Sequence, residues 1–229
     1  MEGELLSGSS FFCIALTIGA YYTGFRGQRK WKKAVFHPIL IGAALVMLTL
    51  WILDIPVEQY QHDCKPLTYL MTPATICLSI AFYEQLQKLK PHVPAILAGV
   101  AGGTLASLLS VWLLSKIFAF SDVLRISLLP KSITSAIGVV LSEQAGGIGA
   151  LTTAVIIITG VFGNIIGPRL VKVFRLEDPI SQGVGFGTAS HVIGTSRAME
   201  LSPLIGAVSS MPLTLAGLIT SVIFSFVFQ

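Results

Sequence analysis

Three segments of the chain place helix-breaking residues and hydroxyl side chains inside otherwise apolar sequence. They are 71–79 (MTPATICLS), 125–143 (RISLLPKSITSAIGVVLSE) and 180–197 (ISQGVGFGTASHVIGTSR). Proline and glycine interrupt helices, and hydroxyl groups can satisfy the backbone groups that an interruption frees. We expect a polar binding site where these segments meet. The expected helix breaks are at Pro73, Pro130, Gly187 and Gly194.

Two ionisable side chains lie in these segments. Lys131 follows Pro130 directly and can neutralise an anion, together with the N–H groups of a half-helix that begins at Ser132. The alternative for Lys131, which stays open, is a side chain that extends to the lipid headgroups. His191 is the one histidine inside an interrupted segment, and we favour a role as carboxylate donor or proton carrier over a purely structural hydrogen bond.

The remaining candidates are hydroxyl side chains close to these two residues. The complete set of expected ligand-binding residues is Lys131, Ser132, Thr134, Ser135, Thr188, Ser190, His191, Thr195, Ser196 and Thr75, with proton coupling assigned to His191. We expect Arg197 and Glu200 to pair on one helical turn, and Asn164 to bond to a neighbouring helix. No nucleophile with a base and no metal-ligand spacing is present, so we expect no enzyme, cofactor or metal site.

Composition defines the elements that must position these residues. Of 229 residues, 53% are hydrophobic and 11% are charged, whereas soluble domains carry roughly a quarter charged residues. Charged side chains are absent from the stretches 5–25, 34–53, 66–83, 91–115, 144–168 and 201–229. Each is near the length that spans a bilayer. We expect an all-α, polytopic transmembrane helix bundle of about seven spans plus broken or re-entrant segments, in a single domain over 1–229.

The basic residues predict the orientation of the chain. Five of the fifteen lie at 26–33, which we interpret as a cytoplasmic loop, so that the N-terminus faces outward. The acidic loop 54–65 is then external. Segment 125–143 either crosses the membrane or re-enters on the same side. We favour re-entry because it puts the basic residues that follow 144–168 inside. Basic residues between apolar runs argue against binding to nucleic acid.

A weak internal repeat accompanies the interrupted segments. Residues 72–86 align with 187–201, and each copy precedes a long apolar span, 93–118 or 203–228. With 125–143 re-entrant, the two copies run in opposite directions across the membrane, which is an inverted repeat typical of secondary transporters. Glycines in GVAGG (99–103) and GVFGNIIG (160–167) indicate close helix packing.

Four blocks give the chain a family resemblance. They are PATICLSIAFYEQL (73–86), SLLPKSITSAIG (127–138), GGIGALTTAVIIITGVFGNIIGPRLV (146–171) and the region 183–220, with GTASHVIGTSRAME at 187–200. These blocks resemble the LrgB/CidB family of bacterial membrane proteins, whose distant relatives include the plastid glycolate/glycerate translocator. The chain departs from the family pattern at His37, where the family often has asparagine, and at Ala136, where it often has proline.

The resemblance implies two alternative functions. One is a proton-coupled carrier of small monocarboxylates such as pyruvate, glycolate or glycerate. The other is an antiholin- or holin-like modulator of murein hydrolase activity and lysis, which acts with a small LrgA/CidA-type membrane partner. We favour the carrier because a lesion-forming protein needs no buried hydroxyl, lysine and histidine groups. The resemblance also implies a bacterial inner-membrane location, membrane lipids as surroundings and a homo-oligomer.

Overall fold

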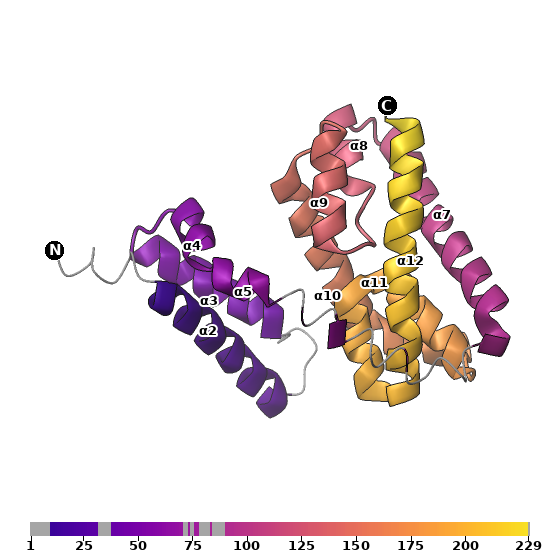
Figure 1. Cartoon of the computed structure of the whole chain (residues 1–229), viewed down its shortest axis with the longest axis horizontal. Helices are drawn as coiled ribbons and strands as arrows, with labels where there is room; N and C mark the ends of the chain where they lie inside the picture. Colours follow the sequence, from indigo (N-terminus) through magenta and orange to yellow (C-terminus); the bar gives the residue numbers. More distant parts are fainter. Residues whose placement is uncertain are drawn as a thin grey trace. The chain divides into compact units, whose positions relative to one another are not determined.

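The computed structural model describes residues 10–31, 38–70, 73, 76, 77, 83 and 90–228. Within these residues all regular structure is helical: ten α-helices and one short 3₁₀ helix, η2 (Lys90–His92), with no strand. The all-α prediction is therefore confirmed. Backbone contacts divide the chain into two compact units, residues 1–77 and 78–229 (Figure 1).

The first unit is built around two apolar helices, α2 (Ser10–Trp31) and α3 (Pro38–Ile52). They approach closely at two glycines, because a Cβ on Gly24 would lie 2.8 Å from the Pro38 carbonyl oxygen and one on Gly42 would lie 3.4 Å from the Tyr21 backbone. Two short helices follow, α4 (Val57–Asp63) and α5 (Lys65–Tyr69). The axis of α4 is bent by 119° from that of α3.

Part of the expected cytoplasmic loop at 26–33 is helical instead. Helix α2 continues through Arg26, Arg29 and Lys30 to Trp31. Cations are stabilised in the last turns of a helix by the exposed carbonyl groups, and Arg26 also lies over the Tyr22 ring at 5.7 Å. Likewise, the expected external loop at 54–65 contains α4.

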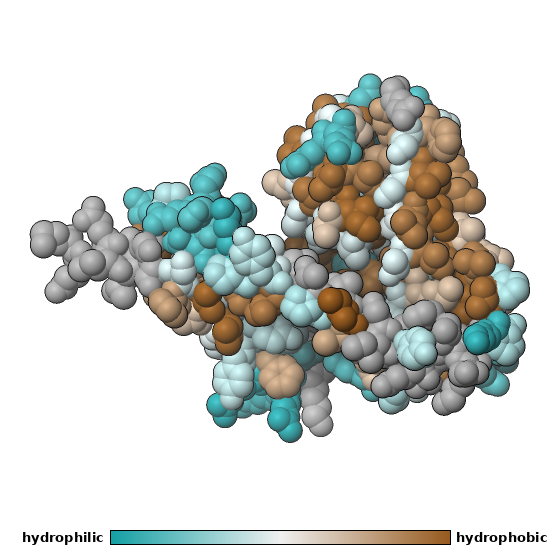
Figure 2. All heavy atoms as spheres, viewed as in Figure 1, coloured by the Kyte–Doolittle hydropathy of each residue, from teal (hydrophilic) through white to brown (hydrophobic). Residues whose placement is uncertain are grey.

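The second unit contains the three long helices α7 (Val93–Ile117), α10 (Gly149–Val173) and α12 (Pro203–Val227). In the part of the chain that the structure describes, these three are long and apolar enough to cross a membrane, and the bent pair α3–α4 makes a fourth if it is one span. Figure 2 shows hydrophobic side chains over the outer faces of α7 and α12, where Leu109, Trp112 and Phe226 are exposed. This surface matches a lipid environment.

The first interruption separates α8 (Asp122–Leu128) from α9 (Ser135–Gln144). Pro130 is fully buried in the non-helical stretch between them. The two arms run back alongside each other, because both reach the start of α10. The Thr152 hydroxyl oxygen lies 3.1 Å from the Ser127 carbonyl oxygen on α8 and 2.7 Å from the Ser142 hydroxyl oxygen on α9. The segment 125–143 is thus not one continuous helix: the chain reverses its direction between two short helices, α8 and α9.

The second interruption lies inside α11 (Pro179–Leu201), where His191 has the non-helical angles φ 43° and ψ −137°. Phe186 and Ala198, on either side of the break, belong to one buried cluster. Twelve residues of straight helix would separate them by about 18 Å, so the chain must reverse at His191. Figure 1 shows α8 at the end of the unit that carries the C-terminus and α11 at the opposite end.

The position of this break corrects one expectation. Gly187 and Gly194 are both helical, and the non-helical residue is His191 between them. The two glycines permit close packing instead. A Cβ on Gly187 would collide with the Ser209 carbonyl oxygen of α12, and one on Gly194 would lie 2.5 Å from the Phe186 carbonyl oxygen of the other arm. Pro73 and Thr75 belong to a region of which the structure describes only isolated residues, and Thr75 lies outside them.

Three helices end at a non-glycine residue in the left-handed region. The residues are Asp54 after α3, Ala119 after α7 and Arg175 after α10, with φ of 53°, 50° and 51°. In each case the residue after the left-handed one donates its N–H group to the carbonyl oxygen of the residue five positions before it, as Phe120 does to Ser115 at 2.9 Å. This left-handed cap satisfies the last carbonyl groups, although glycine would adopt it with less strain.

Candidate functional site

The first part of the site is a cluster of three polar side chains around Lys131. The Lys131 ammonium donates to the Ser107 hydroxyl of α7 at 3.0 Å and to the Ser132 hydroxyl at 3.2 Å. The two hydroxyl oxygens are 2.9 Å apart. The ion pairs of the described residues are His62–Asp63, Arg125–Asp122 and Arg197–Glu200, so Lys131 has no carboxylate partner among them. The cluster is a half-buried positive charge surrounded by neutral hydroxyls.

The break that carries Lys131 also exposes the beginning of α9. Thr134 occupies the N-cap position without a side-chain cap hydrogen bond, and Ser135 is the first helical residue. The first N–H groups of a helix have no partner within the helix and attract anions. Pro130 and Ile133 pack against Gly138 of α9 and hold this break in the interior of the unit.

The second part of the site is a pair of hydroxyls that lack partners. Thr104 of α7 and Thr188 of α11 are 4% and 6% exposed, and neither hydroxyl oxygen has a hydrogen-bond partner among the described residues. The two helices touch here, because a Cβ on Gly103 would lie 2.8 Å from the Thr188 methyl group. Ser107 lies one turn further along α7, so the unpaired hydroxyls are close to the Lys131 cluster.

His191 lies at the reversal of α11 and is 4% exposed. Its Nε2 is 2.8 Å from the Ile156 carbonyl oxygen of α10. Because a carbonyl only accepts, Nε2 carries the proton in this hydrogen bond. Gly160 leaves room for the imidazole ring, since a Cβ there would lie 2.6 Å from two ring atoms. Ile156 also contacts Gly138 of α9, so both interruptions approach the same part of α10.

The other predicted residues of α11 are divided between its two arms. Ser190 is buried against Gly163 of α10 in the first arm. In the second arm Thr195 donates to the His191 carbonyl oxygen at 3.0 Å, and the exposed Ser196 donates to the Ile193 carbonyl oxygen at 2.8 Å. Thr195 and Ser196 thus bond to backbone carbonyls at or next to the reversal, and no hydrogen bond among the described residues joins the three side chains to the Lys131 cluster.

Two expectations about neighbouring polar residues are confirmed. Asn164 of α10 donates through Nδ2 to the Ile193 carbonyl oxygen of α11 at 3.2 Å, which is the expected bond between helices. Arg197 and Glu200 form the expected ion pair. The glycines of GVAGG and GVFGNIIG pack as expected: Gly99 and Gly103 face α11 from α7, and Gly160, Gly163 and Gly167 face it from α10.

Sequence reasoning missed two residues of the site, Thr104 and Ser107. Both lie in the apolar span of α7, where single hydroxyls are common and usually bond to their own helix. A signal was present in their spacing. Residues three apart on a helix share a face, and both follow the GVAGG glycines that bring α7 close to its neighbour.

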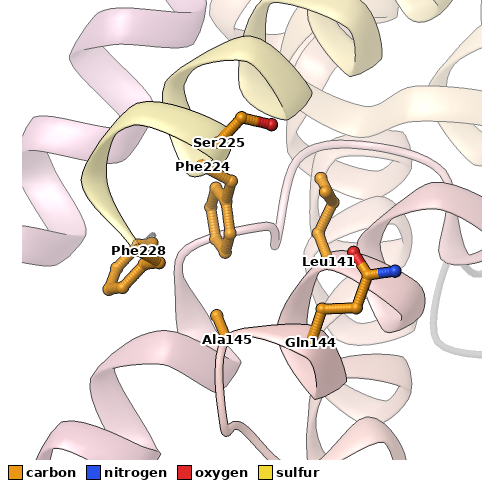
Figure 3. A pocket seen from close by; sticks show the side chains of 6 residues that line it. All are labelled: Leu141, Gln144, Ala145, Phe224, Ser225 and Phe228. Carbon is orange, nitrogen blue, oxygen red and sulfur yellow. The ribbon is translucent and has the colours of Figure 1, made fainter.

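A separate hollow of about 210 Å³ lies between the ends of α9 and α12 (Figure 3). It is lined by Leu141, Gln144, Ala145, Phe224, Ser225 and Phe228. None of the predicted site residues contributes to it. Within the described residues, no three His, Cys, Asp or Glu side chains come together in a way that could hold a metal ion.

The fold and the long apolar helices define a class: an all-helical membrane protein, in which a half-buried lysine at the break between α8 and α9 contacts hydroxyl side chains at this break and on α7. The chain belongs to the LrgB-like family, whose model matches residues 17–229. It is 33% identical over 210 residues to holin-like protein CidB of Staphylococcus aureus (strain N315), and this match covers 92% of each chain. It is 32% identical over 207 residues to the uncharacterized protein YwbG of Bacillus subtilis (strain 168), covering 90% of this chain and 92% of the relative. No solved structure matches the chain.

Proposed function

We propose that this protein is a membrane carrier for small carboxylate anions, which bind at Lys131. The observation that supports the proposal is the environment of the ammonium group: two hydroxyls, no carboxylate among the described residues, and partial burial. A cation inside an apolar bundle is costly unless it is paired. A bound carboxylate supplies the missing negative charge.

The proposed ligand contacts follow from the hydrogen-bonding capacity of the site. Lys131 and the hydroxyls of Ser107 and Ser132 donate to the carboxylate oxygens, and the first N–H groups of α9, near Thr134 and Ser135, add positive potential. Pyruvate, glycolate and glycerate have the size and charge for this role. Proton coupling is proposed at His191, where Nε2 is used by the Ile156 carbonyl and Nδ1 is the nitrogen that takes up a proton.

The proposed topology makes both reversals re-entrant. The α8–α9 reversal enters the bundle from one side and α11 enters from the other, which agrees with their places at opposite ends of the second unit. Non-helical backbone at membrane depth is tolerated where it lines a site. With α2, the α3–α4 pair, the apolar stretch 66–83, α7, α10 and α12 as spans, this arrangement gives six spans, one fewer than the sequence predicts, and an outward N-terminus. The second copy of the repeat, 187–201, is then divided by the reversal at His191 and does not form one inverted segment. A homo-oligomer and a small LrgA/CidA-type subunit complete the proposal.

The names of the relatives favour a second candidate function. Several staphylococcal relatives are named holin-like proteins, including one from Staphylococcus epidermidis (strain ATCC 12228 / FDA PCI 1200) that is 31% identical over 210 residues. Such a protein would modulate murein hydrolase activity and lysis. The comparisons support this candidate better than the carrier, whereas the unpaired charge of Lys131 supports the carrier.

Uptake into proteoliposomes tests the carrier. The purified protein should take up labelled pyruvate or glycolate with saturation, and an unlabelled carboxylate should compete. Lys131→Gln should weaken binding about 10- to 100-fold, because a hydrogen bond to a charged group is lost. The matched control is Lys116→Gln in the last turn of α7, whose ammonium lies over the Trp112 ring. Absence of saturable uptake, or leakage of an encapsulated dye from the same vesicles, would favour the holin-like candidate.

A further inference from the structure

Two buried hydroxyls next to the Lys131 cluster remain unused by the proposed carboxylate contacts. Thr104 and Thr188 are more than nine-tenths buried, and their hydroxyl oxygens have no partner among the described residues. Buried hydroxyls are nearly always hydrogen-bonded, since leaving one unpaired costs free energy. Two such hydroxyls on helices that touch are therefore candidate partners for a polar group of a ligand.

Helix geometry places this pair one turn from the carboxylate contacts. Thr104 and Ser107 are three residues apart on α7, which separates their Cβ atoms by about 5–6 Å on one face. The Thr188 methyl group packs against Gly103, which places Thr188 beside α7, and Gly103 lies one turn before Ser107 on nearly the same face. A ligand whose carboxylate is bound at Lys131 thus brings its second and third carbon atoms toward the two threonines.

We propose that Thr104 and Thr188 form a subsite for an oxygen substituent on the carbon chain of the carboxylate ligand. This inference rests on the proposed carrier function. A threonine hydroxyl can donate or accept, so the subsite takes either a hydroxyl or an oxo group. An unsubstituted acid leaves both threonines unpaired in the complex, and the site discriminates against it. The pair determines specificity, whereas Lys131 provides the attraction for every carboxylate.

Matched pairs of acids test the subsite. Binding of lactate and propionate, and of glycolate and acetate, is measured by competition with labelled uptake in proteoliposomes. The wild-type protein should prefer each hydroxy acid about 10-fold or more, as expected when a polar site rejects a ligand that lacks the matching group. Thr104→Val and Thr188→Val keep the side-chain shape and should reduce this preference to about 3-fold or less. Affinity for propionate and acetate should change much less than affinity for lactate and glycolate.

A buried threonine elsewhere in the second unit provides the control. Thr220 of α12 is 1% exposed and donates to the Ala216 carbonyl oxygen of its own helix at 2.7 Å. Thr220→Val should leave the preference for hydroxy acids intact. Without ligand, Thr104→Val and Thr188→Val should raise the melting temperature, because each removes an unpaired buried hydroxyl, whereas Thr220→Val should lower it.

The outcomes separate this inference from the function on which it rests. If the wild type binds all four acids and the two valine variants keep the full preference, the subsite is refuted and the carrier stands. If Lys131→Gln abolishes uptake of hydroxylated and unsubstituted acids alike, the carboxylate contact is supported independently. If the wild type takes up none of the acids, both proposals fail. A melting temperature that falls in both variants would show that the hydroxyls have structural partners and would also overturn the subsite.

Discussion

His191 combines a strained backbone with a ring hydrogen bond, and two substitutions separate these effects. Its φ of 43° with ψ of −137° is a conformation that glycine adopts readily and other residues adopt at a cost. Its Nε2 donates to the Ile156 carbonyl oxygen at 2.8 Å. His191→Ala loses the ring and keeps the strain, whereas His191→Gly loses the same ring and releases the strain.

The expected difference in stability between the two variants follows from the backbone strain and from the conformational entropy of glycine. Strain at such a residue costs about 1–3 kcal/mol. Glycine lowers the free energy of unfolding by about 0.5–1 kcal/mol relative to alanine, because its unfolded state has a larger conformational entropy. His191→Gly should therefore be more stable than His191→Ala by about 1 kcal/mol, which is the difference between the middle values of the two ranges. The usual order in a helix is the reverse, and the exposed, helical Ala189 provides the matched control: Ala189→Gly should destabilise by about 0.5–1 kcal/mol.

The free energy of unfolding is measured for all three variants in one detergent by denaturant titration, with helical circular dichroism as the signal. The prediction is an inversion of the alanine–glycine order between positions 189 and 191. If His191→Ala is as stable as His191→Gly or more stable, the backbone at His191 is not strained, and the assignment of the reversal to this residue is wrong.

Three further predictions concern other positions. Ala119→Gly should stabilise by about 1 kcal/mol in thermal unfolding, because Ala119 occupies a left-handed cap, and no gain would contradict that cap. Gly163→Ala should destabilise by about 1–3 kcal/mol, because its Cβ would overlap the Ser190 side chain, while Gly102→Ala, with open space, should stabilise by about 0.5–1 kcal/mol. Asp178→Ala should cost about 1 kcal/mol at neutral pH, because Asp178 caps α11. Hydrogen bonds from the Ser181 hydroxyl and N–H group lower the pKa of Asp178 below its usual 3.8. The contribution of Asp178 to stability is therefore present above about pH 4 and is lost as the pH falls through the lowered pKa, and a variant with the wild-type acid profile would refute this.

The two interruptions show how far sequence reasoning reaches. Pro130 marks the first one directly, because proline removes a backbone donor inside an apolar segment, and the break lies around it. The glycines at 183–187 mark only the neighbourhood of the second one. Glycine weakens a helix but also lets two helices touch, and here Gly183 and Gly187 stay helical and pack closely against α12. The strain is instead at His191, which no local pattern distinguishes.

For the site, too, the sequence predicts residues that are neighbours in the chain but not residues that only the fold brings together. Lys131 and Ser132 could be predicted because they follow the proline within one segment. Ser107 is 24 residues before Lys131, and only the reversal of α8 and α9 brings the two side chains within 3.0 Å. Thr104 is identified by the lack of a partner, a property that exists only once the surrounding helices are packed.

The short arms of the two reversals constrain how the chain enters the membrane during synthesis. Helix α8 has 7 residues and α9 has 10, which correspond to about 10 and 15 Å, while each arm of α11 is about half of its 23 residues, or roughly 17 Å. A bilayer core is about 30 Å thick, so no arm can cross it alone. Helices α7, α10 and α12 must therefore be integrated first, and the arms move into the bundle afterwards. The last of these three, α12, follows both reversals in the chain, so the site is completed only after α12 has been integrated.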